Sequence, residues 1–414
     1  MQCSYRMYCE GAGNELPTGY CEEGWYCVGA SDSPNPPDGS GVGGICQPGY
    51  YCPTGSVQMV ECPAGQFCAS SGLSQPNGTC DAGYYCVLAS SSPTPGDGST
   101  GDICPSGQYC VAGSSSGENC PPGTYANFTG AEAITDCLDC VPGYYCEGHG
   151  NAWPDGECQG GYYCPGGDNT STPADTICPQ GHYCVPGSHE AVRCLSGYYQ
   201  DETGKASCKI CVEGFYCDNT VAPVVLYNSS YCPAGHFCPN GTSTAYENPC
   251  PAGTYMNETG AKATEDCVPC PGGYYCDEEG QTTYWKLCTA GFYCKSGAAS
   301  STPTQSTEEA DVCPPGHYCP EGTAQPEKCP LGTYSSATLL TSAVECLNCS
   351  AGMHCSELNL TAPVGPCDPG YYCPHSADTR HLLSVHCRQL LRRGQCSAHP
   401  MPSRHILKRS WFRG

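Results

Sequence analysis

Four pairs of cysteines have the Cys-x2-Cys spacing that occurs in zinc sites and in redox-active dithiols. A zinc ribbon needs two such pairs about 15–20 residues apart, whereas these pairs follow one another at intervals of 71, 59 and 79 residues. A thioredoxin-like dithiol needs a βαβ unit, which a chain so often interrupted by Pro and Gly does not encode. The pairs therefore predict structural disulfides, and we expect no metal and no other cofactor. They are Cys137/Cys140, Cys208/Cys211, Cys267/Cys270 and Cys346/Cys349.

Histidines and paired carboxylates are the other side chains that could act as a general acid or base. Four histidines stand at or beside aromatic positions of a repeated motif, and two carboxylate pairs lie in loops where we expect them to be solvated. An active site needs a pocket held by a rigid scaffold, and repeats of about 20 residues rarely provide one. We predict that the protein is not an enzyme. The residues are His182, His236, His317, His354, Glu278-Glu279 and Glu308-Glu309.

Sixteen short repeats hold 32 of the 42 cysteines, each with two cysteines six residues apart. The residues between them usually read x-x-Gly-x-aromatic, although the first copy has Arg6 in place of the Gly. We expect the Gly to form a turn with positive φ and the aromatic pair to extend as a short strand. Typical copies are Cys46–Cys52, Cys140–Cys146, Cys270–Cys276 and Cys313–Cys319.

Four long repeats begin in the same way but place their second cysteine much later. Each is followed after two residues by the first cysteine of a short repeat, so that short and long repeats combine into a larger period. They are Cys120–Cys137, Cys194–Cys208, Cys250–Cys267 and Cys329–Cys346. Cys387 and Cys396 belong to neither kind.

Composition indicates how such a chain stays folded. Gly (53), Pro (38) and Cys (42) are abundant, Phe and Met are scarce, and Tyr (30) is the main large side chain. Repeats of about 20 residues are too small for a hydrophobic core, so disulfides must supply the order. We predict small disulfide-rich repeats: an elongated array of short β-ribbons and loops, with little regular secondary structure and no single hydrophobic core. In such an array a repeat contacts its neighbours and not distant repeats.

The motif boundaries predict six segments. Tandem short repeats come first, four composite repeats follow, of which the fourth is partial, and a basic tail without the motif ends the chain. Their ranges are 1–119, 120–193, 194–249, 250–328, 329–374 and 375–414.

Several pairing schemes fit the regular cysteines, because sequence alone does not fix connectivity. If every short and every long repeat closes on itself, as in Cys46–Cys52 and Cys120–Cys137, all forty regular cysteines are used. A staggered scheme across neighbouring repeats leaves Cys3 alone. An interlaced scheme, first to third and second to fourth, remains open because partners need only suitable Cα separations.

Cysteine density and sequons indicate the compartment. Disulfides at this density are expected in the secretory pathway, at the cell surface or in the extracellular space. Seven Asn-x-Ser/Thr sequons are predicted N-glycosylation sites, and Asn127 and Asn257 occupy equivalent places in two long repeats. Asn348, between two cysteines, is not expected to be modified. The seven are Asn77, Asn127, Asn169, Asn228, Asn240, Asn257 and Asn359.

Charge separates the repeats from the tail. Residues 1–374 hold 8 Lys/Arg and 39 Asp/Glu, a net charge of −31, whereas residues 375–414 hold 8 Lys/Arg and 1 Asp, a net charge of +7. The acidic repeats exclude nucleic acid as a partner. The tail can be read as a basic amphipathic helix beginning near His381 or as a gene-model artefact, and its abrupt change in composition favours the artefact. Without a signal peptide or an apolar span, the chain is expected to be a fragment whose membrane link, if any, lies elsewhere.

Two long repeats carry a resemblance. Cys120-Pro-Pro-Gly-Thr-Tyr and Cys250-Pro-Ala-Gly-Thr-Tyr, each followed by Asn-x-Thr-Gly and then Cys-x2-Cys, resemble the ephrin-receptor-like cysteine-rich repeat, in the wider growth-factor-receptor and tumour-necrosis-factor-receptor-like cysteine-rich group. With the short repeats between them, such repeats cover most of residues 3–373. The resemblance implies an extracellular spacer or partner-binding surface, and it implies no particular signalling activity.

Three functions follow as hypotheses. The first is a non-enzymatic extracellular stalk, adhesion or receptor-ectodomain segment, a disulfide-stapled spacer or protein-binding array. The second is a secreted matrix, mucus or coat component cross-linked through cysteines, and the third, more remote, is a thiolate metal-binding protein. An extracellular protein partner is expected, but neither its identity nor the oligomeric state can be deduced. Exposed tyrosines of the aromatic pairs would suit partner binding, although packing between repeats is the favoured interpretation.

Overall fold

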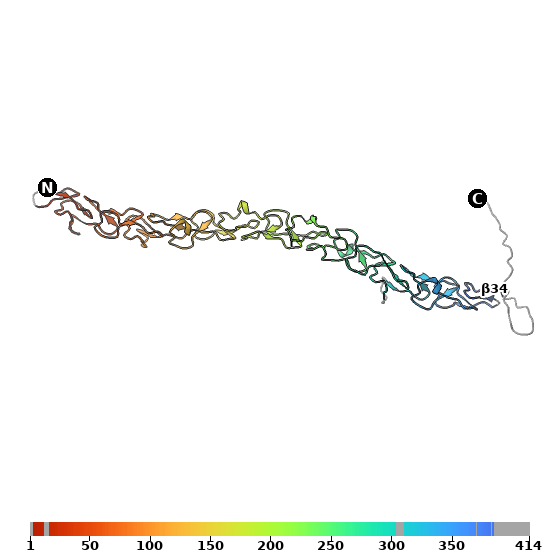
Figure 1. Cartoon of the computed structure of the whole chain (residues 1–414). Helices are drawn as coiled ribbons and strands as arrows, with labels where there is room; N and C mark the ends of the chain where they lie inside the picture. Colours follow the sequence, from red (N-terminus) through yellow and green to blue (C-terminus); the bar gives the residue numbers. More distant parts are fainter. Residues whose placement is uncertain (1–2, 12–15, 304–309, 370, 382, 385–414) are drawn as a thin grey trace, which may run out of the picture. The chain divides into compact units, whose positions relative to one another are not determined.

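The computed structural model describes residues 3–11, 16–303, 310–369, 371–381 and 383–384. The chain forms two units, which are described separately. Unit 1 comprises residues 1–195, 199–209 and 223–225, and unit 2 comprises residues 196–198, 210–222 and 226–414. Within each unit the repeats follow one another in sequence order (Figure 1).

Two-stranded antiparallel ribbons are the regular structure of unit 1. In each ribbon the aromatic residues of one repeat pair with the residues just before the first cysteine of the next, as in Tyr144 opposite Glu157 and Tyr145 opposite Gly156. Each ribbon therefore joins two repeats. The pairs are β1 (Met7–Tyr8) with β2 (Gly19–Tyr20), β3 (Trp25–Cys27) with β4 (Gly43–Ile45), β5 (Tyr50–Tyr51) with β6 (Val60–Glu61), β7 (Gln66–Phe67) with β8 (Gly78–Thr79), β9 (Tyr84–Cys86) with β10 (Gly101–Ile103), β11 (Gln108–Tyr109) with β12 (Glu118–Asn119), β13 (Thr124–Tyr125) with β14 (Leu138–Asp139), β15 (Tyr144–Tyr145) with β16 (Gly156–Glu157), and β17 (His182–Tyr183) with β18 (Val192–Arg193).

Unit 2 is built in the same way, and β19 (Tyr198–Tyr199) and β20 (Lys209–Ile210) each hold residues of both units. Its ribbons are β21 (Thr254–Tyr255) with β22 (Val268–Pro269), β23 (Tyr274–Tyr275) with β24 (Lys286–Leu287), β25 (Phe292–Cys294) with β26 (Ala310–Val312), β27 (His317–Tyr318) with β28 (Glu327–Lys328), β29 (Thr333–Tyr334) with β30 (Leu347–Asn348), β31 (Met353–His354) with β32 (Gly365–Pro366), and β33 (Tyr371–Tyr372) with β34 (Leu383–Ser384). The helical segments of the described residues are single 3-10 turns: η1 (Ile134–Asp136), η2 (Ala174–Thr176), η3 (Tyr227–Ser229), η4 (Thr264–Asp266) and η5 (Ala343–Glu345).

The turn that starts each strand depends on the motif's glycine. In the Cys140–Cys146 repeat the Tyr144 N–H donates to the Val141 carbonyl at 3.0 Å, which closes a β-turn around Pro142 and Gly143. Gly143 has φ +86°, the conformation that a type II turn requires at its third residue. The positive φ expected from the sequence is confirmed here, and Arg6, which replaces the glycine in the first repeat, adopts φ +78°.

In both units a set of four main-chain hydrogen bonds recurs between a repeat and the next. Between Cys140–Cys146 and Cys158–Cys164, the Gly143 N–H donates to the Cys164 carbonyl at 2.8 Å and the Cys158 N–H donates to the Gly143 carbonyl at 2.9 Å. The Gly167 N–H donates to the Cys140 carbonyl at 2.9 Å, and the Cys146 N–H donates to the Asp168 carbonyl at 2.8 Å. The equivalent four bonds join Cys270–Cys276 to Cys288–Cys294 in unit 2. The backbone polar groups of one repeat are thus satisfied by its neighbour.

Second neighbours also touch, which the sequence pattern did not predict. A Cβ on Gly143 would lie 2.5 Å from the carbonyl oxygen of Gly187, two repeats further on. In unit 2 a Cβ on Gly273 would lie 2.4 Å from the Gly322 carbonyl oxygen. The motif's glycine is therefore needed both for its φ and because the backbone two repeats away occupies the space of a side chain.

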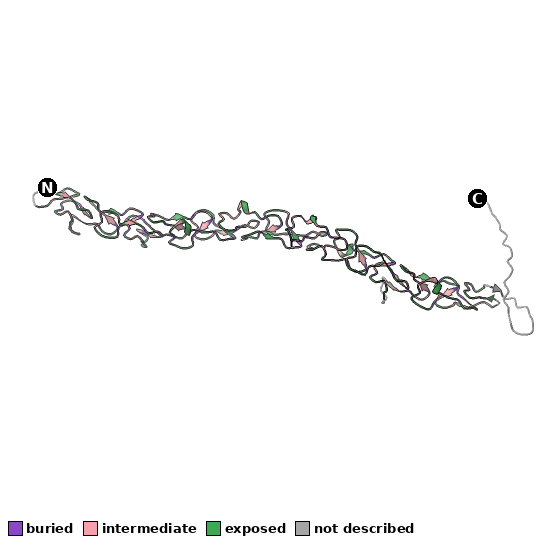
Figure 2. Cartoon of the chain, in the orientation of Figure 1, coloured by how far each residue is buried: buried purple, intermediate pink, exposed green. Residues whose placement is uncertain are grey.

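The cysteines are the interior of the repeats. Most are fully buried, whereas the strands are mostly half-buried or exposed (Figure 2). Buried apolar groups form small separate clusters, such as Cys288, Cys294 and Ala298, rather than one core. The predicted fold class is confirmed in this respect: small disulfide-rich repeats with short β-ribbons and no single hydrophobic core.

The basic tail lies largely outside the described residues. Leu383 and Ser384 form β34, which pairs with β33, so the last described ribbon extends past residue 374. It takes the place of the first turn of the amphipathic helix from His381 that was the less favoured interpretation of the tail. The remainder of that predicted helix, with Cys387 and Cys396, falls in 385–414, which the structure does not describe.

Candidate functional site

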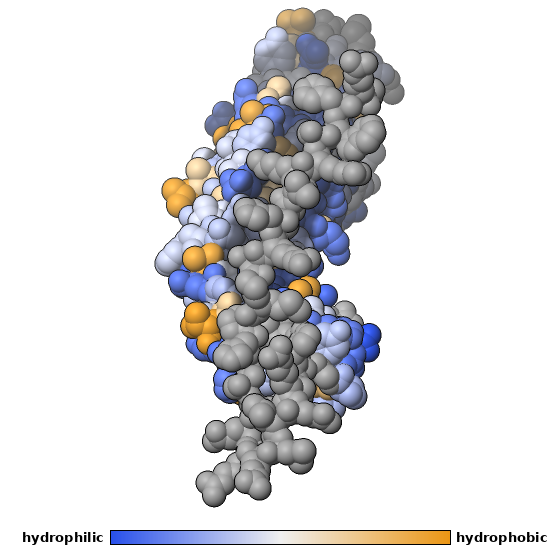
Figure 3. Space-filling model, turned by 90° about the vertical axis from the view of Figure 1, so that its right-hand side faces the viewer, coloured by the Kyte–Doolittle hydropathy of each residue, from blue (hydrophilic) through white to orange (hydrophobic). Residues whose placement is uncertain are grey.

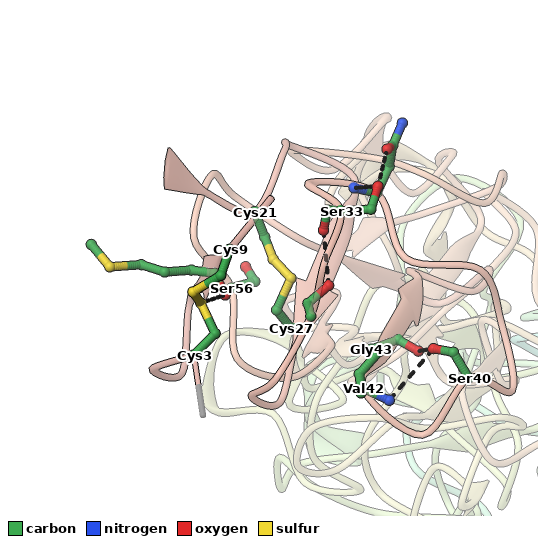
Figure 4. Close-up of a disulfide and its surroundings, with 12 residues drawn as sticks. Cys3, Cys9, Cys21, Cys27, Ser33, Ser40, Val42, Gly43 and Ser56 are labelled. Atoms are coloured by element: carbon green, nitrogen blue, oxygen red, sulfur yellow. Dashed lines mark hydrogen bonds between the residues drawn. A yellow bond between two sulfur atoms is a disulfide. The ribbon is translucent and has the colours of Figure 1, made fainter. Parts of the chain in front are cut away.

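The described cysteines pair within their own repeats. Figure 4 shows two examples, Cys3–Cys9 and Cys21–Cys27. The main-chain N–H of Cys27 donates to the Ser56 carbonyl of the next repeat at 2.9 Å. Across all the pairs in the structure the Cα–Cα separation is 5.7–6.2 Å, within the usual range for disulfides. The structure thus has the self-closed scheme and neither the staggered nor the interlaced one. The long repeats contribute Cys120–Cys137, Cys194–Cys208, Cys250–Cys267 and Cys329–Cys346, and the short copies named above contribute Cys46–Cys52, Cys140–Cys146, Cys270–Cys276 and Cys313–Cys319.

The Cys-x2-Cys pairs are divided between different disulfides. Cys137 is joined to Cys120, and Cys140 is joined to Cys146, so these two sulfurs do not form a dithiol. Among the residues that the structure describes, no three His, Cys, Asp or Glu side chains form a group that could hold a metal ion. Disulfides in this number are typical of an oxidising, non-cytosolic compartment.

The loops of the long repeats are shaped by a carboxylate. Asp136 Oδ2 accepts the N–H groups of Glu132 and Ala133 at 2.7 and 3.0 Å. In the equivalent loop Asp266 Oδ2 accepts those of Lys262 and Ala263 at 2.7 and 3.1 Å, which lowers the pKa of Asp266. Since these bonds favour the ionised form, the carboxylate fixes the loop best when charged.

All seven predicted glycosylation sites lie at the surface. Asn127 and Asn257 are exposed in the loops that Asp136 and Asp266 fix, and the other five asparagines are exposed as well. An exposed, loop-borne asparagine is what glycosylation requires, so each site remains a prediction that the geometry permits. Asn348 is also exposed, but its Oδ1 accepts a hydrogen bond from Ser376 Oγ at 2.7 Å.

Of the histidines and carboxylate pairs considered as acid–base groups, three histidines and Glu278 make local contacts. Three histidines turn Nδ1 toward the carbonyl two residues earlier at 3.1–3.3 Å, and His354 is buried with Nδ1 unpaired. Glu278 pairs with Lys286 at 3.1 Å. These side chains belong to separate repeats, and Glu308-Glu309 lies outside the described residues. The three turned histidines are His182, His236 and His317.

The aromatic pairs are neither fully packed nor fully exposed. Tyr50, Tyr51, Tyr274 and Tyr275 are all half-buried, and Tyr144 is 38% exposed. These tyrosines therefore form no uninterrupted exposed stripe for partner binding, and they are not fully buried between repeats. On the face drawn in Figure 3, hydrophobic residues form small separate patches among hydrophilic ones.

The more exposed aromatics lie in loops, where the repeat pattern gives no signal. Trp153, Tyr246 and Trp285 are 65%, 74% and 69% exposed. Tyr284 lies beside Trp285, and its ring centroid is 5.0 Å from that of Tyr255 and 5.2 Å from that of Tyr274, both in edge-on geometry. The signal that could have found them is the presence of large aromatics outside the Cys-x5-Cys motif.

Comparisons with known proteins show a partial likeness to two plant transporters, and no family model matches the chain. The chain is 32% identical over 133 residues to ABC transporter G family member 28 of Arabidopsis thaliana. It is 29% identical over 129 residues to ABC transporter G family member 25 of Oryza sativa subsp. japonica. Each match covers 30% of this chain and only 11% and 12%, respectively, of the relatives.

Within the part of the chain that the structure describes, no helix has the length and apolar character needed to cross a bilayer.

Proposed function

We propose that this chain is a non-enzymatic extracellular stalk, adhesion or receptor-ectodomain segment, acting as a disulfide-stapled spacer or protein-binding array. The observation that carries the proposal is the way repeats are joined. Within each unit the described repeats are closed by their own disulfides, and a set of four main-chain hydrogen bonds recurs between a repeat and the next. Repeats such as Cys140–Cys146 and Cys270–Cys276 also contact their second neighbours. Such an array presents surface over many repeats without needing a pocket.

Three further features support this role. The seven exposed sequons suit a glycosylated surface protein, and the net charge of −31 over residues 1–374 keeps an extended surface soluble. The likeness to ephrin-receptor-like repeats suggests the same use. The two plant relatives are named as transporters. A stretch similar to theirs is compatible with a segment carried by a membrane protein. We do not propose that this chain is itself a transporter.

The proposal is tested with the full chain made in an oxidising secretory host. We expect no free thiol in residues 3–373, a monomer on a non-reducing gel and a high frictional ratio in sedimentation velocity. Many free thiols in this region, or the sedimentation of a compact sphere, would contradict the spacer role.

A cross-linked matrix or coat component is the second candidate. It is favoured by one sequence feature, namely that Cys387 and Cys396 fall outside the forty regularly spaced cysteines and could bridge chains. It predicts disulfide-linked oligomers that a reducing agent converts to monomers, and Cys387→Ser with Cys396→Ser should abolish them. Thiolate metal storage is not proposed, because the self-closed scheme leaves no thiolate among the paired cysteines.

A further inference from the structure

Two blocks of the chain match residue for residue in their cysteine spacing. Residues 120–158 and 250–288 place all five of their cysteines at the same positions, with a constant offset of 130. The same hydrogen bonds and 3-10 turns recur in both blocks. The first block therefore serves as an internal reference. Where the two blocks have different residues at equivalent positions, the shared fold does not require the residue of the second block.

Tyr284 and Trp285 are not among the residues that the fold needs. The equivalent positions in the first block are Pro154 and Asp155, and Asp155 Oδ2 there accepts the Glu147 N–H at 2.6 Å. In the second block Tyr284 remains 41% exposed and Trp285 69% exposed. Tyr284 packs edge-on against Tyr255 and Tyr274, but both Tyr284 and Trp285 stay open to solvent where the reference block has proline and aspartate. Packing alone therefore does not account for the two aromatics.

Two carboxylates are linked to Trp285 through Lys286. Lys286 Nζ lies 5.6 Å from the centroid of the Trp285 ring and contacts Asp277 Oδ1 at 2.5 Å and Glu278 Oε1 at 3.1 Å. Glu279 adds a third, exposed carboxylate to the same loop. Three carboxylates against one ammonium leave the loop with a formal charge of −2.

The chain's own lysine shows what this surface attracts. The Lys286 side chain is only 16% exposed, and its ammonium lies against an indole ring and two carboxylates. Glu278, with a side chain 74% exposed, and the open parts of Tyr284 and Trp285 offer the same groups to an outside cation. Aromatic faces bind guanidinium by cation–π contact and stacking, and carboxylates bind it through paired hydrogen bonds.

We propose that the cluster of Tyr255, Tyr274, Tyr284 and Trp285, together with Asp277, Glu278 and Glu279, binds an arginine-containing basic segment of a partner protein. Charge complementarity selects this occupant, because a net −31 array repels acidic partners and concentrates basic ones. The proposal rests on the proposed role as a protein-binding array and adds the location and the chemistry of one binding surface.

The test measures binding of fluorescent eight-residue peptides to the full, disulfide-bonded chain by anisotropy. The probes are octa-arginine, octa-lysine and an uncharged Gly-Ser peptide. The variant Tyr284→Pro with Trp285→Asp installs the residues of the reference block, and Trp153→Thr is the matched control, since it replaces an equally exposed tryptophan of the first block by the residue at the equivalent position, Thr283. Glu278→Gln with Glu279→Gln removes charge and keeps the rings.

We expect octa-arginine to bind more tightly than octa-lysine, and the aromatic double variant to weaken octa-arginine binding roughly tenfold. The glutamine variant should also weaken binding and reduce its dependence on salt, whereas Trp153→Thr should change it less than twofold. Equal octa-arginine binding by the wild type and the aromatic variant would overturn the proposal. Tighter binding of the uncharged peptide, or binding of the chain to a second copy of itself in place of octa-arginine, would also overturn it.

Misfolding is checked separately from binding. Each variant must show the same absence of free thiols as the wild type. If the double variant fails this check, Trp285→Asp alone is used, and it is also expected to weaken octa-arginine binding. Free thiols in the wild-type repeats would count against the proposed array, whereas an intact array that binds octa-arginine independently of Tyr284 and Trp285 would overturn only the binding surface.

Discussion

Replacing Gly143 by alanine is expected to loosen the contact between a repeat and its second neighbour. The new methyl group would meet the Gly187 carbonyl oxygen at 2.5 Å, and alanine would have to hold φ near +86°. The left-handed backbone costs about 1–2 kcal/mol, and overpacking of this kind adds about 1–3 kcal/mol. The sum is about 2–5 kcal/mol, and hydrogen-exchange protection falls about tenfold for every 1.4 kcal/mol of local stability lost.

Gly148 provides the matched control, because it has φ +76° and no atom within 4 Å of an added Cβ. Gly148→Ala should therefore cost only the backbone term of about 1–2 kcal/mol. Hydrogen exchange by mass spectrometry, read on peptides containing the Gly143 N–H and its acceptor Cys164, compares the two variants. Equal loss of protection in the two variants would refute the second-neighbour contact as a source of stability.

Three further predictions concern the loops and the charged groups. Asn127→Gln and Asn257→Gln should each remove one glycan, seen as a mobility shift that the wild type shows after enzymatic deglycosylation. Hydrogen bonds lower the pKa of Asp266 below its usual 3.8. The Asp266 carboxylate should therefore stabilise the loop fully above pH 3.8, and this stabilisation should be lost as the pH falls through the lower pKa of the folded state. Asp266→Asn should remove this pH dependence from the hydrogen exchange of the loop. Glu202, whose pKa Lys205 and Lys209 lower to about 2, should remain ionised at pH 3 by NMR titration, and Lys205→Met with Lys209→Met should return it toward 4.5.

The sequence predicted the kind of fold because its cysteines leave little choice. A repeat such as Cys46–Cys52 is too small to bury an apolar core, so its order must come from covalent links and turns. The turn at Gly143 was also predictable, since Pro-Gly at the centre of a turn specifies its geometry locally. These conclusions depend only on residues close together in the chain.

Contacts between repeats were not predictable in the same way. The approach of Gly143 to Gly187 depends on the rotation from one repeat to the next, which main-chain hydrogen bonds set and which no side-chain pattern encodes. The cluster around Tyr284 is likewise outside the repeat motif. Tyr255 and Tyr274 belong to aromatic positions of successive repeats, and only the structure brings a loop residue between them.

The tyrosine pairs also illustrate this limit. Alternation along a strand would place Tyr274 and Tyr275 on opposite faces, one packed and one exposed, but the ribbon leaves both half-buried. A two-residue strand has one partner strand and no sheet to cover a face, so alternation does not separate a buried face from a solvated one. The partner binding that we propose therefore uses loops, where side chains such as Trp285 remain exposed.

The account rests on repeats that are each closed by their own disulfide, and mapping the disulfides tests this most directly. The full chain would be digested without reduction, after alkylation of any free thiols, and the linked peptides identified by mass spectrometry. We predict Cys120–Cys137 and Cys250–Cys267 in the long repeats and Cys46–Cys52 and Cys313–Cys319 in the short ones. Bonds between neighbouring repeats, such as Cys27 to Cys46, or free cysteines within residues 3–373, would contradict it.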